Sequence, residues 1–171
     1  MTRKRVLLNS LIALASTVVG IRAAPAGGSH AAGGGTYFVE PGIRSEFQFS
    51  QSHVQCKIAH AVLPDGTDFQ MLMFSLGVDS VTIDSADGTA TIAGSMVSTV
   101  TLRFPDGSNV TLSETVPYVA YAEDNGTPGA GVDFFSLSVV YTETPGLDQA
   151  DLFGSHATFS GALETGNVSI T

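Results

Sequence analysis

The segment AEDNGTPGAGVDFFSL, residues 122–137, holds the most concentrated group of potential ligands in the chain, because Glu123, Asp124 and Asp133 bracket a glycine-rich loop. Calcium takes about six to eight oxygens from carboxylates and backbone carbonyls, and a glycine-rich loop can turn its carbonyls inward. The spacing differs from that of a helix-loop-helix calcium site. Asn-Gly and Pro128 also favour a compact turn without any ion. We expect a turn, with a calcium site at Glu123, Asp124 and Asp133 as the alternative.

A second group of possible metal ligands, His53, Cys56 and His60, lies in the segment SHVQCKIAHAVL, residues 52–63. On a helix, this spacing places all three side chains on one face. On a strand, His53 points away from Cys56, and Cys56 lies roughly 13 Å from His60 at about 3.3 Å per residue. Zinc bonds of about 2 Å cannot span that distance. Because the neighbouring segments have β character, we expect a strand rather than a helix, and no zinc site.

The sequence offers no reaction signature. It contains no G-x-S-x-G elbow, P-loop or dinucleotide-binding fingerprint, and no spacing assigns His156 to a catalytic triad. Cys56 is the only cysteine, so no disulfide forms within the chain, and we expect its thiol to be buried rather than paired with another molecule. No catalytic residue is assigned, and the sequence favours a protein that is not an enzyme.

The N-terminus has the organisation of a secretory signal peptide. Three cations in TRKR precede a largely apolar run at 6–21, and APA at 24–26 offers a small-residue cleavage site. We predict a signal peptide over residues 1–26 and no transmembrane segment in the mature protein. The expected location is secreted, whether extracellular, periplasmic or at the cell surface.

Cleavage at this site leaves an acidic protein. Three cations, Arg44, Lys57 and Arg103, remain against all 16 Asp and Glu residues, which gives a net charge of −13. Such a surface repels phosphate backbones, so we exclude nucleic acid as a partner. The partners that remain are an extracellular or cell-surface molecule, or a small hydrophobic ligand.

The rest of the chain is organised as short β-rich segments between turns. Residues 27–35, GGSHAAGGG, are poor in large apolar side chains, and we expect a flexible leader there. Residues 36–171 are expected to form one all-β domain, because Pro-Asp-Gly and related turn signals recur between segments rich in Val, Ile, Thr and Phe. Apolar residues alternate along 96–104 and 134–141, as in half-buried antiparallel strands. The nearly continuous apolar segment FQMLMFSL, residues 69–76, predicts a strand that is covered on both faces.

These features predict an antiparallel β-barrel or β-sandwich of roughly eight to ten strands, with at most one short helix. Alternation is the same in both architectures, so the choice stays open.

Several motifs in their order resemble the small secreted bacterial β-domains known as post-COAP domains. The resemblance rests on DNGTPGAGVDFFSL at 124–137, GTATIAGS at 88–95, FSGALETGNVSI at 159–170 and EFQFS at 46–50. Two departures are Thr127, where an acidic residue is common, and ETGN in place of a closing double glycine. The resemblance implies an all-β extracellular module of exported or cell-surface proteins, and it supplies no catalytic residues.

From the sequence we expect a secreted, non-catalytic binding or structural module. One alternative is a small β-barrel that binds, cyclises or isomerises a small hydrophobic ligand, because closed barrels can hold one such molecule. A second alternative is a cell-envelope module stabilised by calcium, the only cofactor considered.

Overall fold

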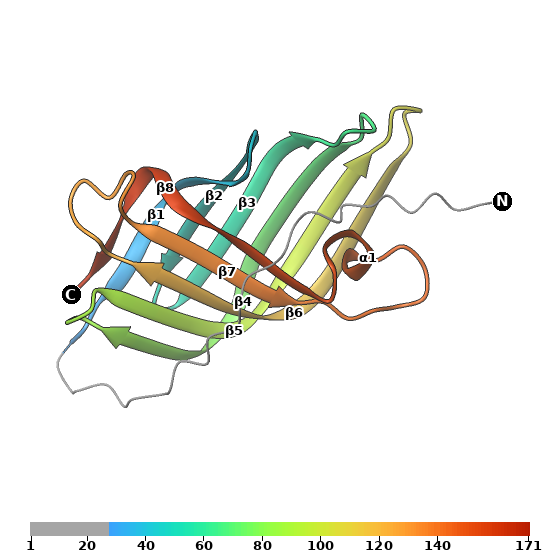
Figure 1. The fold of residues 1–171 in the computed structure, drawn as a ribbon. Helices are drawn as coiled ribbons and strands as arrows, with labels where there is room; N and C mark the ends of the chain where they lie inside the picture. The colour runs from blue at the N-terminus through green and yellow to red at the C-terminus, as the bar shows by residue number, and fades with distance from the viewer. Residues whose placement is uncertain (1–27) are drawn as a thin grey trace.

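The computed structural model describes residues 28–171, which form a closed antiparallel barrel of eight strands (Figure 1). Each strand pairs with its neighbours in the sequence, and β8 pairs with β1 to close the barrel. One short helix, α1, lies between β7 and β8. The strands are β1 Ala31–Glu40, β2 Ile43–Ser50, β3 His53–Val62, β4 Asp68–Asp84, β5 Thr89–Arg103, β6 Asn109–Glu123, β7 Phe134–Val140 and β8 His156–Ile170, and α1 is Gln149–Phe153.

The expected all-β class and strand number are confirmed, and the architecture is a barrel rather than a sandwich. Residues 53–62 form β3, so the choice of strand over helix for this segment is also confirmed. The predicted signal peptide, residues 1–26, lies outside the described residues. Within residues 28–171, no helix is long and apolar enough to cross a membrane.

Alternation along each strand divides the chain between the lumen and the outer surface. In β5, the residues at even positions from Ala90 to Leu102 face inward and are buried, while those at odd positions from Thr91 to Thr101 are partly exposed. Side chains of β7 alternate in the same way, and Phe135, Leu137 and Val139 are buried in the lumen. This pattern fixes the register, because a slip by one residue would turn the apolar face of a strand toward water.

Two hairpins repeat one turn chemistry at the same end of the barrel. In LPDGT, residues 63–67, Gly66 has φ of 85° and Asp65 accepts a hydrogen bond from the Thr67 backbone N–H at 3.0 Å. In FPDGS, residues 104–108, Asp106 accepts from the Ser108 N–H at 2.9 Å in the same way. Proline, aspartate and glycine therefore act in these segments as the turn signals that the sequence predicted.

The flexible leader expected at residues 27–35 is wrong for residues 31–35, which begin β1 and pair with both β2 and β8. The glycines are needed here because β1 and β8 approach closely: a Cβ on Gly35 would overlap the backbone carbonyl of Thr165. Glycine in a strand marks such a close approach as well as flexibility. Composition alone could not separate the two meanings.

The prediction that residues 69–76 are covered on both faces is also wrong. Phe69, Met71 and Met73 are buried in the lumen, but Leu72 and Phe74 point outward and are 39% and 37% exposed. A closed barrel is a single layer of sheet, so within residues 28–171 no second layer covers the outer face of β4. The apolar side chains on the inner face of β4 therefore fill the lumen, and those on its outer face form part of the molecular surface.

The lumen is filled by the protein's own side chains. Four aromatic rings, from Tyr37, Phe47, Phe49 and Phe135, form one cluster in which Phe47 and Phe135 stack with ring centroids 4.2 Å apart. An eight-stranded barrel is just wide enough for such filling. The core therefore occupies the space that a ligand would need.

Candidate functional site

The loop between β6 and β7 is tied to the last strand by Asp133. This side chain is fully buried, and its two carboxylate oxygens accept backbone hydrogen bonds from Asn125 at 2.9 Å and from Val168 at 2.7 Å. The Asp133 backbone carbonyl also accepts from the Leu163 N–H at 2.9 Å. A buried carboxylate requires such donors, and both of its oxygens have one.

Further contacts from the same loop continue along β8. Asp124 Oδ2 accepts the Ile170 N–H at 3.0 Å, and the Gly129 N–H donates to Asn167 Oδ1 at 2.9 Å. Residues 163–170 of β8 pair with β1 on one edge only, because pairing with β7 ends at Ala162. The carboxylates therefore occupy the position of a missing strand and accept N–H groups that β7 does not reach. We call the loop 124–133 with these contacts the latch.

Glu123, the third predicted calcium ligand, makes different contacts. Its carboxylate accepts from the Tyr121 hydroxyl at 2.8 Å and from Asn125 Nδ2 at 3.2 Å. Over residues 28–171, no group of three or more His, Cys, Asp or Glu side chains is placed to hold a metal ion. The carboxylates have a structural use as hydrogen-bond acceptors, and the calcium site at Glu123, Asp124 and Asp133 stays a prediction.

The other predicted ligand group is dispersed by the strand geometry. His53 Nδ1 lies 3.3 Å from Ser75 Oγ, His60 Nδ1 lies 2.7 Å from Asp68 Oδ1, and Cys56 is buried in the lumen. The expected burial of Cys56 is confirmed. The Ser75 hydroxyl also accepts the Val54 N–H at 3.0 Å, at the point where backbone pairing between β3 and β4 ends.

Buried polar groups in the lumen bond mainly to one another. Cys56 Sγ lies 3.1 Å from Ser45 Oγ and 3.6 Å from the Tyr37 hydroxyl, and the Tyr37 hydroxyl donates to the Phe159 carbonyl at 3.2 Å. Burial raises the pKa of Cys56, so its thiol stays protonated and is a poor nucleophile. Among the described residues, the buried hydroxyls Thr67 Oγ1 and Tyr118 Oη have no hydrogen-bond partner.

Helix α1 closes one mouth of the barrel. Gln149 reaches inward, where its side-chain nitrogen donates to the Ser98 carbonyl at 2.9 Å and its oxygen accepts from Ser98 Oγ at 2.6 Å. Ser98 Oγ also lies 3.2 Å from the Tyr141 hydroxyl. Phe153 stacks on Tyr141 with ring centroids 5.7 Å apart. Helix α1 is therefore held by one polar and one aromatic anchor.

A small apolar cavity of about 20 Å³ lies below Phe153. This volume is close to the minimum that holds one water molecule. Its lining is wholly apolar and comes from Val39, Ile43, Ile58, Leu63, Phe69, Phe153 and Phe159.

A broad area of the outer surface carries no charged side chain. It is formed by the outward side chains of five consecutive strands, and we call it the neutral face. Glu114 is the only charged residue within these stretches; it belongs to the inward-facing series of β6 and accepts the Thr142 N–H at 2.9 Å. The stretches are residues 70–76 of β4, 91–101 of β5, 111–121 of β6, 134–140 of β7 and 158–160 of β8.

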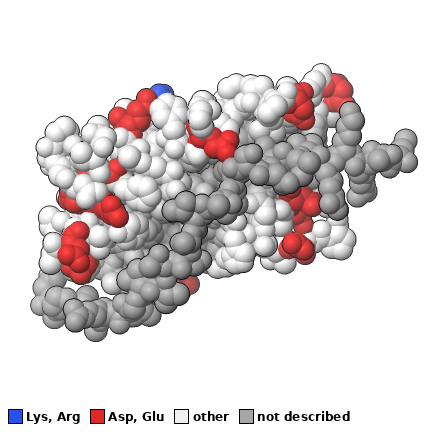
Figure 2. All heavy atoms as spheres, viewed as in Figure 1, with Lys and Arg blue, Asp and Glu red and all other residues white. Residues whose placement is uncertain are grey.

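Figure 2 shows one side of the molecule, where carboxylates gather toward both ends of the barrel and one further group lies near the upper edge between them. The neutral face is also rich in hydroxyl groups that pair across strands. Thr99 lies 3.2 Å from Ser113, and Ser138 lies 3.0 Å from Thr158, measured between hydroxyl oxygens. Because these hydroxyl groups already hydrogen-bond to one another, they need few hydrogen bonds from a partner molecule when the face is buried.

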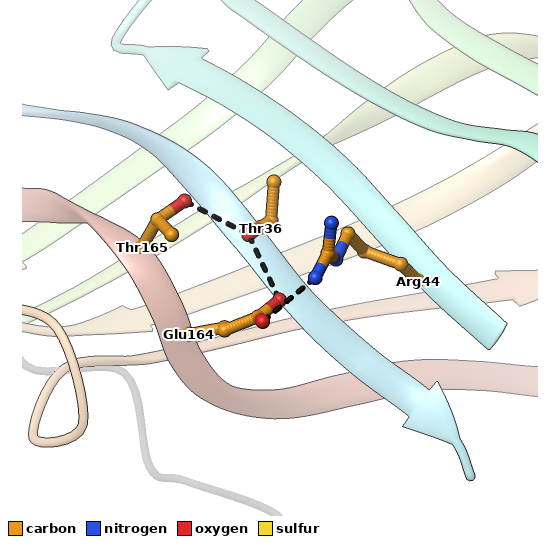
Figure 3. Close-up of polar contacts among 4 residues, drawn as sticks. All are labelled: Thr36, Arg44, Glu164 and Thr165. Atoms are coloured by element: carbon orange, nitrogen blue, oxygen red, sulfur yellow. Dashed lines mark hydrogen bonds and ion pairs between the residues drawn. The ribbon is translucent and has the colours of Figure 1, made fainter. Parts of the chain in front are cut away.

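A polar cluster on the opposite seam has a structural role. Arg44 pairs with Glu164 at 2.7 Å, and Thr36 Oγ1 lies 2.8 Å from Thr165 Oγ1 (Figure 3). The Arg44 guanidinium also lies 5.3 Å from the Phe38 ring centroid. The contacts join β2 to β8 across β1. Exposed ion pairs contribute only about 0–1 kcal/mol, so this cluster supports the seam modestly.

Sequence reasoning identified the latch as a turn but missed the neutral face. The signal was present in FQMLMFSL and in the alternation of Ser and Thr along β5, but the apolar outward residues were interpreted as buried.

Comparison with known proteins adds no assignment: no family model, no curated protein and no solved structure matches this chain. The resemblance to post-COAP domains therefore stays a prediction from the sequence.

Proposed function

We propose that this protein is a secreted, non-catalytic module that works outside the cytoplasm by presenting the outer surface of a filled barrel to a partner. The observation that supports this most is the filled lumen, where aromatic rings occupy the interior and leave a cavity of about 20 Å³. A drug-sized ligand needs a pocket of about 300–1,000 Å³. The Cys56 thiol and the Tyr37 hydroxyl are buried within this lumen.

The experiment uses the protein secreted by its own host. We expect a polypeptide that starts near residue 27, equal native and denatured masses apart from bound protein, and retention on cell-surface fractions. Replacing Val119 with Lys puts a cation on the neutral face, and Val62 with Lys puts one on β3 outside it; only the first should reduce retention. Equal retention of both variants and the wild type would refute a role for this face.

The apolar cavity under α1 favours a second candidate, a barrel that takes a small hydrophobic ligand when α1 moves aside. Phe153 contacts the rings of Phe69, Tyr141 and Phe159, all near the mouth. This candidate predicts that indole or hexanol raises the melting temperature of the wild type. Replacing Ile58 with Phe fills the cavity and should abolish that rise. No rise in the wild type would remove this candidate and leave the first one standing.

A further inference from the structure

We propose that the neutral face is the surface through which two copies of this chain associate. The inference rests on the proposed function, because it names the partner of the outer surface. Three properties of the face carry it: its area, its apolar side chains and its lack of charge.

The area of the neutral face suits a stable protein contact. Its five stretches contribute four, six, six, four and two outward side chains, 22 in all. Each outward side chain covers about 32 Å² of sheet, from two residues of about 3.3 Å rise and a strand spacing of about 4.8 Å, so the face spans roughly 700 Å². Specific interfaces bury about 600–1,000 Å² of accessible surface on each partner, so a contact of that size would use most of the neutral face.

The exposed apolar side chains concentrate on this face. Within residues 28–171, nine large apolar residues are exposed, and five of them lie on this face: Leu72, Phe74, Leu76, Val119 and Val140. They lie among serines and threonines rather than among charges. Interface cores are depleted in charged residues, and the neutral face shares that property.

The charge of the protein favours a second copy as the occupant. Two acidic molecules repel each other, and the repulsion is smallest where neither surface carries an acid. A cationic partner would instead be drawn to the acidic ends of the barrel. Hydroxyl groups donate and accept, so a surface of apolar and hydroxyl side chains is complementary to itself across a two-fold axis.

The test measures association by sedimentation velocity and light scattering. We expect the wild type to form a dimer, and Phe74→Lys or Val119→Lys to weaken it at least ~100-fold because each would bury an unpaired charge. The matched control is Val62→Lys at a 61% exposed position on β3, outside the face. Lysine lowers the net negative charge in all three variants, so general electrostatics would strengthen association. Only burial at the contact would weaken it.

The inference is overturned by a wild type that stays monomeric up to roughly 100 µM. Equal dimerisation of Val119→Lys and Val62→Lys would also overturn it. The proposed function has a separate readout, namely retention on cell-surface fractions. A monomer whose retention Val119→Lys reduces would assign the face to another partner, overturning the inference while leaving the proposed function in place. A monomer that is not retained would overturn both.

Discussion

Replacing Asp133 with Asn tests whether the acidic loop is a latch or a calcium site. The carboxylate is fully buried and accepts the N–H groups of Asn125 and Val168. An amide keeps one acceptor oxygen and turns an NH₂ group toward the other donor, so one buried N–H loses its partner. Leaving such a group unsatisfied costs about 1–3 kcal/mol, and more where the lost acceptor was charged. We expect a loss near 3 kcal/mol.

For a domain of this size, about 1 kcal/mol shifts the melting temperature by roughly 3–4 °C, so Asp133→Asn should melt about 10 °C lower. The assay is thermal unfolding followed by circular dichroism, with calcium and with chelator. The control is Asp79→Asn, at an exposed position of β4. The latch predicts the same loss in both solutions. A loss seen only with calcium, together with a wild-type melt that chelator lowers, would refute the latch as the explanation and support the calcium site.

Two further predictions concern the seam and the buried thiol. Gly35→Ala should destabilise the barrel by several kcal/mol, because its Cβ would overlap the backbone of Thr165. The control is Gly77→Ala, whose Cβ meets open space and which should be nearly neutral. Urea unfolding measures both variants, and equal effects would contradict the close approach of β1 and β8. Burial raises the pKa of Cys56, so the stability that its neutral thiol contributes is present below the ordinary thiol pKa of about 8.5 and declines as pH rises above it. Unfolding free energy should therefore fall as pH rises above about 8.5 in the wild type, and Cys56→Ala should flatten that fall. The same slope in both proteins would show that Cys56 is not its source.

The sequence predicted those features that depend on neighbouring residues. Alternation located β5 and β7, and Pro-Asp-Gly located the hairpins, because a pleat and a turn are both decided within a few residues. The buried state of Cys56 was expected because a free cysteine behaves as a small hydrophobic side chain.

Features that depend on contacts distant in the chain were not predictable in the same way. The glycines at 33–35 have the composition of a flexible linker, and only the approach of β8, more than a hundred residues later, gives them a packing role. Likewise, nothing local to Asp133 indicates that one of its oxygens accepts from Val168. A carboxylate beside a glycine-rich loop has the same sequence pattern whether it binds an ion or replaces a strand.

The wrong expectation for β4 connects the fold to the proposed partner. A strand that is apolar on both faces predicts two covering layers, and the barrel supplies only the inner one. Exposure of Leu72, Phe74 and Leu76 to water has an unfavourable free energy of roughly 25 cal/mol per Å². Association through the neutral face would remove part of that area from water without bringing carboxylates together. The apolar pattern of β4 is then consistent with burial on both faces, by the lumen within one chain and by a second copy outside it.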